Sequence, residues 1–142
     1  MKILVFTEGT IVDDRMQTAR WNLFGNAAAK LRAWQRCGAT IVYLTSKKTS
    51  ENIEKVRTAL KDGGAPMAEL FFRIGDEDYG QVASRIAPDV IVEDDCKSIG
   101  GEIEMTSPKL PTELRAKVKQ IVVPEFGGID HLPDDPSELI DR

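Results

Sequence analysis

The 142-residue sequence predicts a three-layer α/β fold around a five-stranded, mainly parallel central sheet. Three observations carry this prediction. Short continuous apolar runs recur along the chain, which is typical of strands buried on both faces of a parallel sheet. Amphipathic helical stretches alternate with these runs. The links between them are short, so we expect right-handed strand–helix–strand crossovers.

Five apolar runs are the predicted strands. The first reads KILVF and spans residues 2–6. The other four read TIVYL, ELFFR, DVIVE and QIVV. They span residues 40–44, 69–73, 89–93 and 120–123. Pro124 ends the last strand, because proline has no N–H group to donate to a sheet.

Four helices are predicted from apolar residues at helical spacing and from residues that start or stop helices. They span about residues 26–36, 50–62, 78–87 and 111–118. Asn26 is a candidate N-cap, Gly38 is a helix stop, and Pro111 suits the first helical position. Residues 7–24 are expected to be irregular, as is the tail from residue 125, which ends in a short turn.

Composition and charge exclude several function classes. The chain holds 19 Lys and Arg against 23 Asp and Glu, a formal net charge of −4. A nucleic-acid surface needs a basic excess, so we expect no nucleic-acid partner. No apolar stretch approaches the roughly 20 residues that span a bilayer, and no signal peptide precedes the first strand. We therefore expect no membrane association and a cytoplasmic protein.

Two cysteines, Cys37 and Cys96, are expected to be reduced thiols. Cys37 stands at a predicted helix end and is expected to be a small buried apolar residue. Cys96 follows Asp94 and Asp95, whose carboxylates would raise the pKa of its thiol, so a reactive thiolate is not expected. With His131 as its single histidine and no CxxC pair, the sequence does not predict a zinc site.

Polar side chains follow the first, second and fourth predicted strands. Open parallel sheets bind ligands outside the carboxyl ends of their strands, so these side chains are expected to share one site. Hydroxyls and lysines suit phosphate oxygens, and clustered carboxylates suit Mg²⁺. The candidate phosphate ligands are Thr45, Ser46, Lys47 and Lys48, and the candidate Mg²⁺ ligands are Asp94 and Asp95. The two aspartates have an alternative role, because aspartates also cap the turn that follows them.

Over most of its length the chain resembles the haloacid dehalogenase (HAD) superfamily. That family's first motif is an apolar strand followed by Asp-x-Asp-Gly-Thr, and residues 3–10, ILVFTEGT, are similar. Its second motif resembles residues 41–45, IVYLT, and its fourth resembles residues 90–95, VIVEDD. The resemblance implies a Rossmann-like, HAD-type fold, Mg²⁺ as cofactor, and a phosphatase or related hydrolase activity.

The first motif departs from the family's pattern. Anchored on Gly9 and Thr10, the family's nucleophilic aspartate falls on Phe6, which cannot attack phosphorus. A one-residue deletion would place Thr7 there, and its hydroxyl would need a nearby base to act as a catalytic nucleophile. The family's general acid/base falls on Glu8, which is therefore the second candidate catalytic residue.

The resemblance also implies an open site. Family members that act on small metabolites usually insert a cap after the first or third strand. Residues 11–25 could hold a flap but not a cap domain, and the loop after Arg73 is shorter still. We therefore expect residues 1–142 to form a single capless domain. The candidates for the family's third-motif lysine are Lys47, Lys48 and Arg73.

Three functions remain open from the sequence. The first is a Mg²⁺-dependent phosphohydrolase remnant, in which Glu8 handles protons and metal-activated water attacks the phosphate. The second is a non-catalytic phosphate- or metal-binding or regulatory protein, with a small phosphorylated ligand as its partner. The third is a scaffold that works by homo-oligomerisation, with apolar flap residues at the interface.

Overall fold

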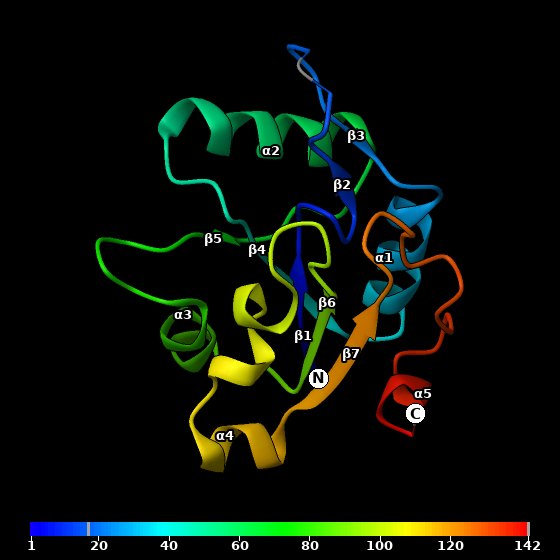
Figure 1. Ribbon diagram of the computed structural model, residues 1–142. Coiled ribbons are helices and arrows are strands. Elements are labelled where there is room, and N and C mark those ends of the chain that lie inside the picture. The colour runs from blue at the N-terminus through cyan, green and yellow to red at the C-terminus, as the bar shows by residue number, and fades with distance from the viewer. Residues whose placement is uncertain (17, 142) are drawn as a thin grey trace.

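The molecule is built around a five-stranded, all-parallel sheet in the order β5-β4-β1-β6-β7 (Figure 1). Our structure is a computed structural model that describes residues 1–16 and 18–141, so Gln17 of the predicted flap lies outside the described residues. The strands are β1 (Lys2–Phe6), β4 (Thr40–Leu44), β5 (Leu70–Phe71), β6 (Val90–Asp94) and β7 (Lys119–Val123). The predicted α/β fold with a five-stranded parallel sheet is confirmed.

Strand β1 is the centre of the sheet. Its Ile3 lies opposite Ile41 of β4 on one side and Val90 of β6 on the other. Four of its five residues are buried, as expected for a strand covered on both faces. Because β4, β1 and β6 run in parallel, the loops that follow them emerge at one edge. This is where the sequence predicts a ligand site.

One face of the sheet is covered by α1 (Ala27–Arg36), α2 (Ser50–Asp62) and α5 (Ser137–Ile140). The apolar stripe of α1 includes Leu31 and Trp34, both fully buried. The Trp34 indole N–H donates to the carbonyl of Pro133 at 2.8 Å, which ties the C-terminal tail to this layer.

The other face is covered by α3 (Tyr79–Ile86), α4 (Thr112–Lys117) and the 3₁₀ turn η2 (Ser107–Lys109). A capping box between Asp78 and Gln81 starts α3. Gly80 lets α3 approach η2 closely, since a Cβ there would stand 2.1 Å from the Lys109 carbonyl oxygen. A second 3₁₀ turn, η1 (Gly101–Glu104), lies in the loop after β6.

A two-stranded antiparallel ribbon, β2 (Val12–Asp13) with β3 (Asn22–Leu23), stands above the sheet next to α2 (Figure 1). The expectation that residues 7–24 are irregular is therefore wrong in part. Each ribbon strand has only two residues, too few to show a strand pattern in a polar stretch. Trp21, the residue that precedes β3, is 9% exposed and belongs to the core between the sheet and helices α1 and α2.

Two local predictions need correction. Cys37 is exposed rather than buried, because α1 ends at Arg36 and the chain turns at Gly38, where φ is +94°. The third strand is shorter than predicted, because β5 is an edge strand that pairs with β4 through only two residues. Among the described residues, no helix has the length and apolar character needed to cross a membrane.

Candidate functional site

The loops after the central strands enclose a cavity of about 420 Å³ at the carboxyl edge of the sheet. We refer to this cavity as the strand-end cleft. Four predicted site residues line it: Glu8, Ser46, Lys47 and Asp94. The candidates Thr7 and Thr45 are fully buried beneath it, whereas Lys48 is exposed and outside its lining.

The carboxylate of Glu8 receives four hydrogen bonds. The hydroxyls of Thr7 and Thr45 donate to Oε2 at 2.5 and 2.6 Å. The backbone N–H and the hydroxyl of Ser46 donate to Oε1 at 2.6 and 2.7 Å. Glu8 is 7% exposed. The loops after β1 and β4 are therefore joined by one carboxylate, and the donors predicted to hold a phosphate are bonded to it.

The candidate lysine of this loop is also paired. Lys47 Nζ lies 2.6 Å from Asp14 Oδ2, and both side chains are largely shielded from solvent. The same ammonium lies 5.1 Å from the ring of Trp21, within cation–π range. Lys47 thus connects the ribbon to the β4 loop and leaves little free positive charge at the cleft.

Asp94, at the end of β6, is 2% exposed. Thr10 donates its hydroxyl to Asp94 Oδ1 at 2.7 Å, and the Cys96 N–H donates to Oδ2 at 3.1 Å. Burial raises the pKa of this carboxyl above its ordinary value of 3.8, against the lowering effect of the Thr10 hydrogen bond. Gly9 packs against the carboxylate so closely that a Cβ there would stand 2.9 Å from Oδ2.

Asp95 is not part of the cleft lining, and its carboxylate bonds to backbone N–H groups of its own loop and of the loop after β7. Its Oδ1 accepts N–H groups from Lys97 and Glu125, each at 3.3 Å. This is the turn-capping geometry that the sequence leaves open as an alternative to metal binding.

These residues do not form a ready site for Mg²⁺. Of the two candidate ligands only Asp94 lines the strand-end cleft, and both of its oxygens already accept hydrogen bonds. Within residues 1–16 and 18–141 there is no group of three His, Cys, Asp or Glu side chains that could hold a metal ion. The donor set therefore does not fit a resident divalent cation, which needs several oxygen ligands.

Phe6 ends β1 and lines the strand-end cleft. Its ring meets that of Tyr79 edge to face, with centroids 5.3 Å apart. The guanidinium of Arg73 lies 4.3 Å from the centroid of the same tyrosine ring. Burial raises the pKa of Tyr79 to about 12, so its hydroxyl stays protonated at neutral pH.

The strand-end cleft also contains charged residues that the sequence does not assign to the site. Arg15, from the ribbon, stacks over Phe126, 4.1 Å from the ring centroid, and pairs with Asp13. Glu104 comes from η1, and Glu125 follows β7. Because parallel sheets bind ligands beyond the carboxyl ends of their strands, the sequence offers a signal for Glu125, which follows β7, but not for Arg15 or Glu104. The charged lining comprises five carboxylates and two cations, namely Glu8, Asp14, Asp94, Glu104 and Glu125, with Arg15 and Lys47.

No protein-family model matches this sequence, and no curated protein matches it. Among solved structures, a D,D-heptose 1,7-bisphosphate phosphatase from Burkholderia thailandensis is similar, with a TM-score of 0.53 and 10% identity, covering 88% of this chain and 92% of that chain. The fold is HAD-like.

A universal stress protein in complex with cAMP is also similar, at 12% identity and a TM-score of 0.45, covering 87% of this chain and 94% of that chain. The likeness to the phosphatase, at 10% identity, concerns the fold alone.

Proposed function

We propose that this protein is a non-catalytic binding protein on a HAD-like fold, and that its strand-end cleft takes up a small ligand without hydrolysing a phosphate ester. The observation that carries the proposal is the saturation of Glu8. Its carboxylate, with two oxygens and one negative charge, occupies the four donors of Thr7, Thr45 and Ser46. It thereby takes the place that a phosphate oxygen would need.

The same arrangement argues against the phosphohydrolase alternative. Each oxygen of Glu8 accepts two hydrogen bonds, so neither is directed at a substrate proton. The Thr7 hydroxyl is fully buried and bonded to Glu8, out of reach of a phosphorus atom in the cleft. Phe6 supplies an apolar ring to the cleft, at the position where the resemblance to the first HAD motif implies a nucleophile.

The charge of the strand-end cleft points to a neutral or positively charged ligand. Both cations in its lining are paired with ribbon aspartates, Arg15 with Asp13 and Lys47 with Asp14. Asp94 and Glu125 carry no such cation in the ion pairs formed by the described residues. A multiply charged phosphate would therefore meet an unfavourable potential.

Anion rescue tests the proposal. We expect Glu8→Ala to lower the thermal midpoint, because it leaves four donors without this acceptor, two of them fully buried. Phosphate or sulfate should then restore several degrees in the variant and little in wild type, since a ligand at about 100 times its Kd adds roughly 2.7 kcal/mol. Sodium chloride at equal ionic strength controls for general salt effects.

Glu93→Ala is the matched control. Glu93 is a second buried carboxylate, 2% exposed, that accepts hydrogen bonds from Thr106 and Ser107. It does not line the cleft, so the added anion should not rescue its loss. If Glu8→Ala does not fold, Glu8→Gln keeps the shape of the side chain and should fold without taking up phosphate. Equal stabilisation of wild type and Glu8→Ala by phosphate would overturn the proposal.

Activity and mass measurements separate the rival functions. We expect no hydrolysis of p-nitrophenyl phosphate with or without Mg²⁺. Metal-dependent turnover that disappears in Asp94→Asn would establish the phosphohydrolase instead. A solution mass that rises with concentration, without any ligand response, would favour the scaffold that assembles as a homo-oligomer.

A further inference from the structure

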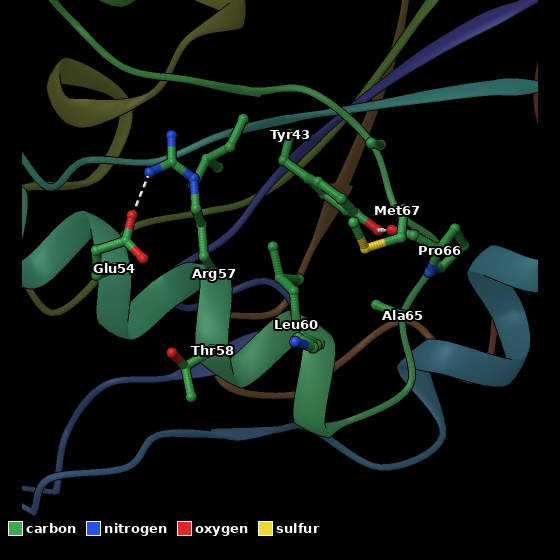
Figure 2. A pocket seen from close by; sticks show the side chains of 11 residues that line it. Tyr43, Glu54, Arg57, Thr58, Leu60, Ala65, Pro66 and Met67 are labelled. Atoms are coloured by element: carbon green, nitrogen blue, oxygen red, sulfur yellow. Dashed lines mark hydrogen bonds and ion pairs between the residues drawn. The ribbon is translucent and has the colours of Figure 1, made fainter.

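A second cavity, of about 380 Å³, lies between the C-terminal half of α2 and the segment that leads into β5 (Figure 2). We name it the α2–β5 cavity. It is formed by other elements than the strand-end cleft, and none of its lining residues belongs to that cleft. Its volume lies within the range of about 300–1,000 Å³ that is usual for small-molecule pockets.

The floor of the α2–β5 cavity is apolar and fixed. Leu60, Ala65, Pro66 and Leu70 are buried, and Figure 2 shows Leu60 and Tyr43 directed into the space between the helix and the chain. Tyr43 is 1% exposed and donates its hydroxyl to the Pro66 carbonyl at 2.9 Å. This bond holds the segment before β5 in place and satisfies the tyrosine, so the floor offers mainly apolar surface to a ligand.

The rim of the cavity is polar and positively charged on the helix side. Four residues of α2 at positions i, i+3, i+4 and i+7 share one stripe of the helix: Glu54, Arg57, Thr58 and Lys61. Arg57 pairs with Glu54 through one of its five N–H donors. Lys61 adds a second cation at the same rim, so the lining has two cations against one carboxylate.

On the outer side the rim carries Met67, which is 85% exposed. A flexible, polarisable thioether at the mouth of a pocket adapts to apolar groups of different shape. An exposed large apolar side chain next to a buried apolar floor is also a feature of ligand-binding surfaces.

We propose that the α2–β5 cavity is a binding site for a small amphipathic carboxylate. Its apolar body would lie on Tyr43, Leu60 and Leu70, under Met67. Its carboxylate would lie at the rim, within reach of Arg57 and Lys61. The excess positive charge of this rim distinguishes it from the acidic strand-end cleft and selects an anion over a cation of the same length.

Decanoate is the probe, and decyltrimethylammonium of the same chain length is the opposite-charge comparison. We expect decanoate to shift the methyl NMR signals of Leu60, Ala65, Met67 and Leu70, while decyltrimethylammonium shifts them weakly or not at all. Arg57→Glu/Lys61→Glu should weaken decanoate binding about tenfold or more, as expected when two nearby charges are reversed.

Arg115→Glu/Lys117→Glu is the matched control. Both residues are exposed on α4, and this double change alters the net charge by the same amount. Its decanoate affinity should equal that of wild type. If the reversed helix α2 is unstable, Arg57→Gln/Lys61→Gln gives the same test without like-charge repulsion. Equal shifts with the ammonium, or decanoate shifts mainly at methyls that do not line the α2–β5 cavity, would overturn the proposal.

Discussion

Thr10 and Asp94 exchange hydrogen bonds in both directions across the carboxyl edge of the sheet. The Thr10 hydroxyl donates to Asp94 Oδ1 at 2.7 Å and accepts the Asp94 backbone N–H at 2.9 Å. Both residues are almost completely buried. This reciprocal pair joins the loop after β1 to the end of β6 and sets the position of the Asp94 carboxylate.

A substitution at Gly9 tests how tightly the Asp94 carboxylate is held in place. Gly9 has φ of +81°, and a Cβ would stand 2.9 Å from Asp94 Oδ2. We expect Gly9→Ala to lower the free energy of unfolding by about 2–4 kcal/mol, from a left-handed backbone strain of about 1–2 kcal/mol plus a buried clash. Urea unfolding measures the loss.

Gly38→Ala separates the two contributions to that loss. Gly38 has φ of +94° but open space around its would-be Cβ. This variant should show the backbone strain alone and a smaller loss. Equal losses at the two glycines would mean that the contact with Asp94 is readily relieved.

The raised pKa of Asp94 predicts a pH dependence of defined sign. Its cause is burial, which disfavours the ionised form in the folded state. Between the ordinary value of 3.8 and the raised folded value, the folded protein binds more protons than the unfolded chain. The contribution of Asp94 to stability should therefore fall as pH rises through this window and stay low above it.

Unfolding free energies of wild type and Asp94→Asn, measured from pH 7 down into this window, check the sign. Wild type should gain stability relative to the variant as pH falls. Asp135 should show the opposite sign at lower pH: hydrogen bonds from Ser137 lower its pKa, so wild type should lose stability relative to Asp135→Asn as pH falls below the ordinary value of 3.8. A wild-type protein that loses stability relative to Asp94→Asn on acidification would contradict the prediction.

The two thiols should differ strongly in reactivity. Burial, with the negative charge of Asp94 second, raises the pKa of Cys96 to about 12, as its acidic neighbours predict. Cys37 is exposed. At pH 8 almost all of the Cys96 thiol is therefore expected to stay protonated. We expect one thiol per native chain to react promptly with a disulfide reagent and two in denaturant. Prompt labelling of native Cys37→Ser would show that Cys96 is accessible after all.

Much of the fold follows from the sequence, because a strand buried on both faces must be a continuous apolar run. The run ILV in β1 and its equivalents in β4 and β6 meet that demand. The sequence does not predict the ribbon of β2 and β3, because two residues per strand are too few to show an apolar pattern. The exposure of Cys37 depends on the residue at which α1 ends, and helix boundaries are the least certain part of a sequence pattern.

The sequence predicts which residues of the candidate site are neighbours, but not which groups their side chains contact. Strand order places Glu8, Thr45 and Asp94 at one edge, and the sequence predicts that neighbourhood. It does not predict that the Glu8 carboxylate accepts hydrogen bonds from the Ser46 loop, or that Asp95 accepts them from backbone N–H groups. Such choices are made between rotamers with small energy differences, and they depend on neighbours distant in the chain.

The central place of β1 has a consequence for biosynthesis. Its Ile3 pairs with Ile41 and Val90, so one partner strand is made early and the other late. At about 5–20 residues per second, β1 leaves the ribosome several seconds before β6 exists. During that interval an apolar strand edge is open to unwanted pairing. Nascent chains arrested before residue 90 should therefore depend on chaperones, whereas chains released after β7 should not.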